Sequence, residues 1–453
     1  MFSDELEHIS WEETTARIHA KTDADVRRAL SKEHCNVEDF MALISPAAAP
    51  YLETMARLSK KYTEARFGKT ISMFVPLYIT NSCTNSCVYC GFHISNPMPR
   101  TILTEEEIVN EYKAIKKLAP FENLLLVTGE NPAKAGVPYI ARALDLAKPY
   151  FSNLKIEVMP LKTEEYAELK EHGMNGVICF QETYHKENYE KLHPTGPKHD
   201  YAYHTEAMDR AMDGGIDDVG LGVLFGLNNY RYDFAGIIMH AEHLEAAKGV
   251  GPHTISVPRL RRADDIDPDV FDNGISDDLF AKIVACIRIA VPYTGMIVST
   301  RESAETRKKV LQLGISQISG GSRTSVGGYV EEEPEEENSA QFDVSDRRTL
   351  DEVACWLMEM GFVPSFCTAC YREGRTGDRF MKLLKSRQIV NCCHPNALMT
   401  LKEYLEDYAS PKTKEIGEAL IQKELNVITN PKVKEKTAEY IANIHNGQRD
   451  FRF

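Results

Sequence analysis

The chain has 453 residues, enough for a large barrel with an appendage, and its 43% hydrophobic content can fill a large core without disulfide or metal staples. The net charge of −14, from 53 basic against 67 acidic side chains, would repel nucleic acid and anionic membranes, so neither is expected as a partner. The acidic first residues contain no signal-peptide core, and no later apolar run is long enough to cross a bilayer, so we expect a soluble, cytoplasmic protein.

The first 70 residues are predicted to form a helical arm. Amphipathic stretches at 23–32 and 51–66 have helical periodicity, and the Ser45-Pro46 pair separates them. No residue in 1–70 suggests chemistry.

From residue 71 onward, short β-branched runs alternate with amphipathic segments. The candidate strands are 72–79, 123–127, 154–159, 176–180, 217–224, 254–257, 296–299 and 316–319. Eight strands separated by helices predict an α/β fold, a (β/α)8 barrel of the TIM type over 71–361. In such barrels functional residues gather on the loops after the carboxyl ends of the strands.

Two further parts complete the predicted organisation. The glutamate run with proline at 331–337 is most simply a solvated surface loop, and 348–360 is predicted to be the final barrel helix. Residues 362–453 are predicted to form a smaller, mostly helical extension.

Three of the eleven cysteines directly follow the first predicted strand. Cys83, Cys87 and Cys90 are spaced by three residues and then two. Soft thiolates this close on a loop can bind a cubane iron–sulfur cluster, leaving its fourth iron without a protein ligand. A structural zinc site would need a fourth ligand, which is not evident nearby, and a group of core thiols is the other alternative.

A second cysteine set opens the extension. Cys367, Cys370 and Cys393 form a Cys-x2-Cys-x22-Cys pattern, again three thiolates. Two alternatives stay open at this point. His394 could complete a zinc site, and Cys392 could replace Cys393 as the ligand, since two adjacent residues rarely both face one small cluster.

The first loop, with an aromatic residue before its last cysteine, resembles the signature of radical S-adenosylmethionine (SAM) enzymes. Together with the motifs at 127–130, 181–185 and 299–303, it makes the chain similar to the aromatic amino-acid lyases of that superfamily over nearly its whole length. The extension, with the motif Cys-Thr-Ala-Cys-Tyr-Arg at 367–372, resembles the [FeFe]-hydrogenase maturase branch and not the tyrosine lyase of thiamine biosynthesis.

This resemblance implies a 4Fe–4S cluster on the first three cysteines that binds SAM and cleaves it to a 5′-deoxyadenosyl radical. It also implies four cofactor-binding residues. Tyr89 would contact the adenine, Gly129 and Glu130 the methionyl ammonium, and Glu157 the ribose.

The resemblance further implies an auxiliary 4Fe–4S cluster with an additional labile iron, held by the second cysteine set. His253 matches the family position that ligates this extra iron. A residue just before the predicted strand 254–257 would lie at the opposite end of the barrel from the strand-end loops, unless that strand boundary is misplaced.

The implied substrate is L-tyrosine, cleaved between Cα and Cβ to p-cresol and dehydroglycine, with dehydroglycine then yielding CO and cyanide for an iron–carbonyl–cyanide unit. Arg301 is the candidate for the substrate carboxylate, because a guanidinium fork fits a carboxylate in a bidentate manner. Arg323 is the competing candidate, and Ser299 is a third candidate catalytic residue. A reducing electron donor and other hydrogenase maturases are the expected partners.

Two other functions remain as alternatives. The chain could be a tyrosine lyase that supplies dehydroglycine for thiazole synthesis, with a merely structural extension. It could also be an iron–sulfur scaffold without turnover.

Overall fold

The computed structural model describes residues 1–453 with the exception of 264–265 and 331–339. The glutamate run predicted as a surface loop, 331–337, therefore lies outside the described residues.

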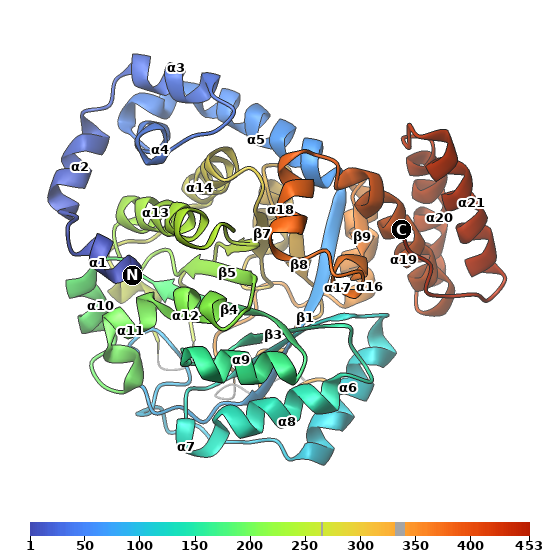
Figure 1. Cartoon of the computed structure of the whole chain (residues 1–453), viewed down its shortest axis with the longest axis horizontal. Helices are drawn as coiled ribbons and strands as arrows, with labels where there is room; N and C mark the ends of the chain where they lie inside the picture. The colour runs from blue at the N-terminus through green and yellow to red at the C-terminus, as the bar shows by residue number, and fades with distance from the viewer. Residues whose placement is uncertain (264–265, 331–339) are drawn as a thin grey trace.

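Eight parallel strands of the described chain close into a barrel (Figure 1). They are β1 (Thr70–Thr80), β2 (Asn123–Thr128), β3 (Asn153–Glu157), β4 (Met174–Glu182), β5 (Asp218–Val223), β6 (Thr254–Ser256), β7 (Gly295–Val298) and β8 (Gln317–Ser319). Each strand pairs with the next, and β8 pairs with β1, so the sheet has no open edge between them. The predicted TIM-type barrel is confirmed.

The helices around the barrel bury apolar faces against strands that are apolar on both sides, as parallel strands usually are. Every residue of β2 and β5 is buried. The surrounding helices are α6 (Glu105–Leu118), α7 (Pro132–Ala135), α8 (Val137–Ala147), α9 (Thr163–Glu171), α10 (Lys186–Leu192), α11 (Tyr201–Thr205), α12 (Ala207–Asp213), α13 (Tyr230–Lys248), α14 (Asp277–Ala290), α15 (Ala304–Leu311) and α16 (Leu350–Glu359). Short 3₁₀ helices occur at Pro46–Tyr51, Pro197–His199 and Pro268–Val270.

The N-terminal helices form an arc along one side of the barrel (Figure 1). They are α1 (Phe2–Leu6), α2 (Trp11–His19), α3 (Asp23–Ser31), α4 (Val37–Leu43) and α5 (Leu52–Phe67). Phe40 of α4 stacks on Phe234 of α13 with ring centroids 3.8 Å apart, so aromatic packing fixes the arc to the barrel wall.

A ninth strand, β9 (Val363–Ser365), adds to the barrel beside the beginning of β1. Its register pairs Thr70 with Val363 and Ser72 with Ser365. The strand has three residues and contains Pro364, so neither length nor composition marks it in the sequence. Because β9 runs parallel to β1, the chain leaves it close to where the barrel strands begin.

The extension that follows is helical. Its helices are α17 (Ala369–Arg372), α18 (Gly377–Lys385), α19 (Val390–Asp407), α20 (Pro411–Leu425) and α21 (Pro431–His445). Figure 1 shows α19, α20 and α21 as a group beside the barrel, and α19 contacts α5 at the end of the N-terminal arc. Among the described residues, no helix has both the length and the apolar character needed to cross a membrane.

Gly236 allows α13 to lie directly against Tyr184, which follows β4. A Cβ atom at position 236 would come within 2.4 Å of the Tyr184 ring. Gly236→Ala gains about 1 kcal/mol of helix propensity, but overpacking a buried ring costs typically 1–3 kcal/mol. Because 2.4 Å is far inside van der Waals contact, we expect the upper part of that cost and hence a net loss of stability of about 1–2 kcal/mol, measured by denaturant unfolding.

The control for this prediction is Gly274→Ala, since a Cβ atom there would have no neighbour within 4 Å. Its stability should stay within about 0.5 kcal/mol of the parent chain. Equal stability of the two variants would contradict the packing argument.

Candidate functional site

The first cysteine loop is an irregular segment that begins directly after β1. Arg100 holds it from both sides of the cysteines. Its guanidinium donates to the carbonyls of Asn81 and Phe92 at 2.9 Å each, and to those of His93 and Asn96 at 2.6 and 3.0 Å. One cation thus satisfies four loop carbonyls, so the loop keeps its shape without regular secondary structure.

The loop is also attached to its neighbours through backbone bonds. The Thr84 N–H donates to the carbonyl of Glu130 at 3.0 Å, and the Val88 N–H donates to that of Leu192 at 3.1 Å. These contacts attach the cysteine loop to the segment after β2 and to the end of α10.

Cys83, Cys87 and Cys90 share one partly enclosed region. Cys87 is buried and the other two are half-buried. Burial, followed by the charge of Cys83, raises the pKa of Cys90 to about 11, so these sulfurs act on one another electrostatically. Thiols with raised pKa values are protonated when no metal is bound and must release protons to become ligands.

The cofactor-binding candidates lie around this loop. The buried Tyr89 hydroxyl is 2.6 Å from His193 Nε2, and Glu130 accepts a hydrogen bond from Asn85 Nδ2 at 2.8 Å. A Cβ atom on Gly129 would lie 2.4 Å from the Ser82 carbonyl oxygen, so only glycine fits between β1 and β2 there. The structure therefore brings Tyr89, Gly129 and Glu130 together with the cysteines.

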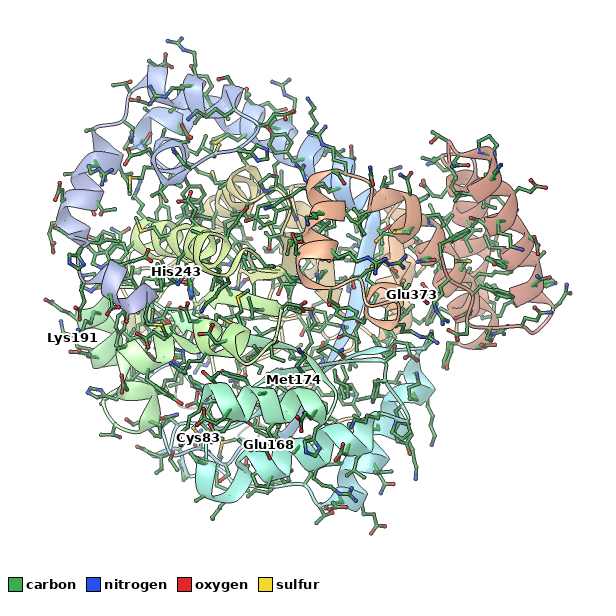
Figure 2. All side chains as sticks on the ribbon, viewed as in Figure 1. Cys83, Glu168, Met174, Lys191, His243 and Glu373 are labelled. Carbon is green, nitrogen blue, oxygen red and sulfur yellow. The ribbon has the colours of Figure 1, made fainter. Side chains whose placement is uncertain are left out.

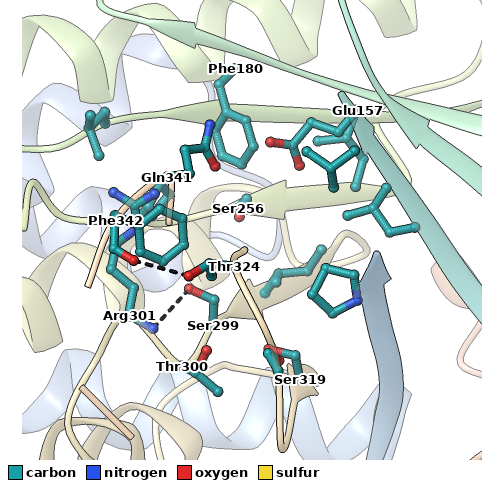
Figure 3. Close-up of a pocket in the computed structure, with 18 of the residues that line it drawn as sticks. Glu157, Phe180, Ser256, Ser299, Thr300, Arg301, Ser319, Thr324, Gln341 and Phe342 are labelled. Atoms are coloured by element: carbon teal, nitrogen blue, oxygen red, sulfur yellow. Dashed lines mark hydrogen bonds between the residues drawn. The ribbon is translucent and has the colours of Figure 1, made fainter. Parts of the chain in front are cut away.

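A cavity occupies the carboxyl end of the barrel, and we call it the mouth cavity. Cys90, Tyr89, Glu157, Ser299 and Arg301 all line it. Figure 3 shows Glu157 on one side and Arg301 with Ser299 on the other. The sequence-predicted residues from three strand ends therefore converge on one cavity, which opens onto the first cysteine loop.

Arg301 reaches this cavity with its guanidinium against the Phe342 ring, the Cζ atom 3.6 Å from the ring centroid. Its backbone N–H donates to Ser299 Oγ at 3.3 Å, and its Nε is buried without a hydrogen-bond partner (Figure 3). Arg323 instead lines a separate surface cleft together with Asp346. Of the two candidate arginines, only Arg301 lines the mouth cavity.

Sequence reasoning missed two charged residues of this region. Glu182 lines the mouth cavity. Lys198, which lies outside the strands, donates a hydrogen bond from Nζ to Glu182 Oε1 at 2.8 Å. Lys198 Nζ also lies 5.9 Å from the centroid of the Tyr89 ring. Glu182 has a φ of 66°, in the left-handed region that non-glycine residues rarely adopt. The Gln-Glu-Thr-Tyr motif at the end of β4 was a usable signal for Glu182, whereas Lys198 had none.

The second cysteine set lies at the other end of the barrel. A second cavity, which we call the base cavity, is lined by Cys367, Cys370 and Cys393. Residues at the beginnings of strands, including Thr70 and Asn123, line it as well. In Figure 2, Cys83 of the first loop and Glu373, three residues after Cys370, lie well apart. The two cysteine sets are thus at opposite barrel ends.

The open alternatives for the second set can be compared with the geometry. Cys393 lines the base cavity, whereas the Cys392 thiol donates to the carbonyl of Ile389 at 3.2 Å. His394 Nε2 lies 3.3 Å from the carbonyl oxygen of Glu424, on the side of α20. Cys393 is therefore the better placed of the two vicinal cysteines, and His394 does not turn toward them.

His253 lies at the same barrel end as the second cysteine set. Its ring stacks on Phe380 with centroids 4.9 Å apart, and Phe380 lines the base cavity. His253 Nε2 is buried without a hydrogen-bond partner, and Nδ1 lies 3.5 Å from Asp218 Oδ2. The barrel end at which β6 begins is thus the end that carries the second cysteine set, so the predicted start of this strand needs no correction.

Neither cysteine set forms a compact site for a single ion among the described residues. Within the part of the chain that the structure describes, no three His, Cys, Asp or Glu side chains are close enough to hold one metal ion. The thiolates of a cubane bind different irons, so its ligands line a cavity instead of meeting at one point. The second cysteine set meets this condition in the base cavity, and the first set borders the mouth cavity through Cys90.

The two cavities approach each other inside the barrel. Phe74, Leu125, Ile178 and Ile297 line both of them, so a layer of apolar side chains lies between. On its outer side, the base cavity shares Cys367 and Thr368 with a surface cleft. The Thr368 hydroxyl lies 2.6 Å from the Ser152 hydroxyl at this junction.

A parallel barrel with a three-cysteine loop after its first strand defines a class of enzyme, and comparison with known families agrees. The family model for the radical SAM superfamily matches residues 77–238. A second model, the biotin and thiamin synthesis associated domain, matches residues 256–363. The chain is a radical SAM enzyme, a class whose members carry a 4Fe–4S cluster and SAM.

Two groups of relatives identify the family within this superfamily. The 2-iminoacetate synthases of Salmonella typhimurium and Escherichia coli are both 41% identical to the chain, over 80% of its length and 95% of theirs. A crystal structure of HydG, a maturase of the [FeFe]-hydrogenase, is 43% identical with a TM-score of 0.93, covering 98% of this chain and 99% of that one. HydG from Carboxydothermus hydrogenoformans is 34% identical with a TM-score of 0.80, covering 95% and 94%. The chain belongs to the radical SAM lyase family that contains 2-iminoacetate synthase and HydG.

Glu157 gives a pH-dependent prediction. Burial, followed by the charge of Glu182, raises the pKa of Glu157 from 4.5 to about 7. Keeping this carboxylate ionised costs stability, a cost absent below pH 4.5 and complete above about pH 7. The free energy of unfolding of Glu157→Gln, relative to that of the parent chain, should therefore rise by up to about 3 kcal/mol from pH 5 to pH 8. Urea unfolding of the metal-free protein measures it.

The control is the exposed Glu168 on α9, changed to Gln. The difference in unfolding free energy between this variant and the parent chain should be the same at pH 5 and pH 8. A parallel response of both variants would mean that Glu157 does not carry the burial cost.

Proposed function

We propose that this chain cleaves the Cα–Cβ bond of L-tyrosine to p-cresol and dehydroglycine, and then converts dehydroglycine to CO and cyanide. These products would form an Fe(CO)(CN) unit for the [FeFe]-hydrogenase active site. The observation that carries the proposal is the presence of two cysteine-lined cavities at opposite ends of one barrel. Likeness to HydG over 98% of the chain supports it, because that likeness includes the extension, whereas the 2-iminoacetate synthases match 80%.

At the mouth, Cys83, Cys87 and Cys90 would hold the radical SAM cluster. When bound, the cluster and SAM supply an electron and the carbon radical that starts the reaction. The chain's own contribution is to position the cofactor. Gly129 permits close approach of the backbone, and the Glu130 carboxylate, oriented by Asn85, suits the methionyl ammonium. Tyr89 and Glu157 would contact the adenine and the ribose.

Arg301 would bind the tyrosine carboxylate. Its guanidinium is held flat by Phe342, and its buried Nε lacks a hydrogen-bond partner, as expected of a donor that awaits a ligand. Ser299 fixes the backbone at this position through the Arg301 N–H. The substrate would thus be oriented by a charge-assisted contact.

At the base, Cys367, Cys370 and Cys393 would hold the auxiliary cluster, and His253 would ligate an additional labile iron. The buried, unpartnered Nε2 of His253 supports this role. Imidazole suits an exchangeable iron, and production of CO and cyanide beside such an iron would capture both as ligands.

We also propose that the chain has three functional parts, a helical arm over 1–70, the barrel over 71–361 and an auxiliary-cluster domain over 362–453. A reducing electron donor would serve the first cluster, and other hydrogenase maturases would receive the product. Neither nucleic acid nor a membrane is proposed as a partner, given the net charge of −14.

His253→Ala tests the two-step function. Under anaerobic conditions with tyrosine, SAM and dithionite, the parent protein should form p-cresol, CO and cyanide. The variant should still form p-cresol while CO falls sharply, because His253 lies at the barrel end away from the first cysteine loop. Absence of CO and cyanide from the parent protein would favour a tyrosine lyase for thiazole synthesis, and absence of 5′-deoxyadenosine would favour a non-catalytic scaffold.

Arg301→Met tests the substrate contact. Loss of a charge-assisted bidentate contact should raise the KM for tyrosine by about 10- to 100-fold and change the KM for SAM far less. Arg323→Met is the matched control, because this arginine lines a different cleft. Equal effects of Arg301→Met on both KM values, or a larger effect of Arg323→Met, would remove the assignment.

A further inference from the structure

Asp218, the first residue of β5, is a buried carboxylate shared by three structural elements. It is 1% exposed. Lys155 of β3 approaches it at 2.7 Å, and the Tyr371 hydroxyl of α17 donates to it at 2.5 Å. The third neighbour is His253, whose Nδ1 lies 3.5 Å away. One anion thus connects the barrel to the second cysteine loop, in which Tyr371 directly follows Cys370.

The position of the His253 ring is fixed independently of any ligand. Its backbone N–H donates to the Val219 carbonyl at 3.0 Å, and its carbonyl accepts from the Gly295 N–H at 2.8 Å. Phe380 covers one ring face. The two ring nitrogens therefore have different surroundings, since Nδ1 faces a carboxylate and Nε2 is buried without a partner.

This arrangement has a chemical consequence. A carboxylate beside Nδ1 favours the tautomer that carries its proton there, which leaves the Nε2 lone pair free for a metal. Such a partner also raises the basicity of the coordinating nitrogen. The Lys155 ammonium offsets the charge of Asp218, without which a buried carboxylate would be costly.

We propose that Asp218 is a positioning residue for the auxiliary site, which sets the tautomer and orientation of His253 for the labile iron and fixes the Cys370–Tyr371 segment beside it. The inference rests on the proposed role of His253 as an iron ligand. It adds a carboxylate to the auxiliary site that no cysteine or histidine motif indicates.

The test is the affinity of the cluster-loaded protein for Fe(II), measured anaerobically against a competing chelator. Acid-labile sulfide is counted in parallel to report the clusters. Asp218→Asn keeps the side-chain size and removes the charge, and it should weaken Fe(II) binding about 10- to 100-fold with unchanged sulfide. Asp218→Glu keeps the charge and should bind Fe(II) more tightly than the Asn variant.

Asp209→Asn is the matched control. Asp209 is also a buried carboxylate beside a buried histidine, His243, at 2.9 Å, but it belongs to α12 on the outside of the barrel. The same chemical change there should leave Fe(II) affinity at the parent value. A loss of affinity in this control as large as in Asp218→Asn would overturn the inference.

Comparison with His253→Ala separates this inference from the proposed function. If His253→Ala abolishes Fe(II) binding and Asp218→Asn does not change it, the positioning role is wrong and the ligand role of His253 stands. If His253→Ala retains parent affinity, the ligand role fails first. If Asp218→Asn loses sulfide, the carboxylate serves to hold the extension and not to position the histidine. Where the Asn variant does not fold, the Fe(II) affinity and sulfide content of Asp218→Glu distinguish the same two roles.

Discussion

The arrangement of both cysteine sets depends on the pairing of one long strand. β1 has eleven residues, whereas β6 and β8 have three each. Its first three residues pair with β9 and its last six span the pairing with β2. At about 3.3 Å per residue, the strand extends roughly 35 Å. The first cysteine loop follows its carboxyl end and the second set is attached beside its beginning, so β1 fixes how far apart the two sites lie.

Each barrel end combines buried carboxylates with a lysine from another element. At the mouth, Lys198 pairs with Glu182, and Glu157 faces the same cavity. At the base, burial alone would raise the pKa of Asp218, but Lys155 and His253 outweigh burial and lower it. A buried carboxylate remains ionised only where such cations are close. The pKa of the mouth carboxylate Glu157 is thus raised, whereas that of the base carboxylate Asp218 is lowered.

Much of this organisation could be predicted from the sequence, because strong local patterns specify it. The eight barrel strands are apolar runs between amphipathic helices, and the cysteine spacing marks both sets. β9 could not be found, since three residues with a proline carry no periodicity. Lys198 and Asp218 could not be assigned either, because their importance comes from contacts with distant residues. From the sequence, His253 was at the wrong barrel end for a functional residue. Because β9 pairs with the first residues of β1, the second cysteine set lies at that same end, which explains the position of His253.

The base cavity has unlike boundaries toward the surface and toward the mouth. It shares Cys367 and Thr368 with a surface cleft, and the Thr368 hydroxyl lies 2.6 Å from the Ser152 hydroxyl there. Toward the mouth cavity it shares only apolar side chains. Because an apolar layer gives a charged solute no compensating partner, such a solute would be desolvated in crossing toward the mouth but would meet hydroxyl groups in crossing toward the surface.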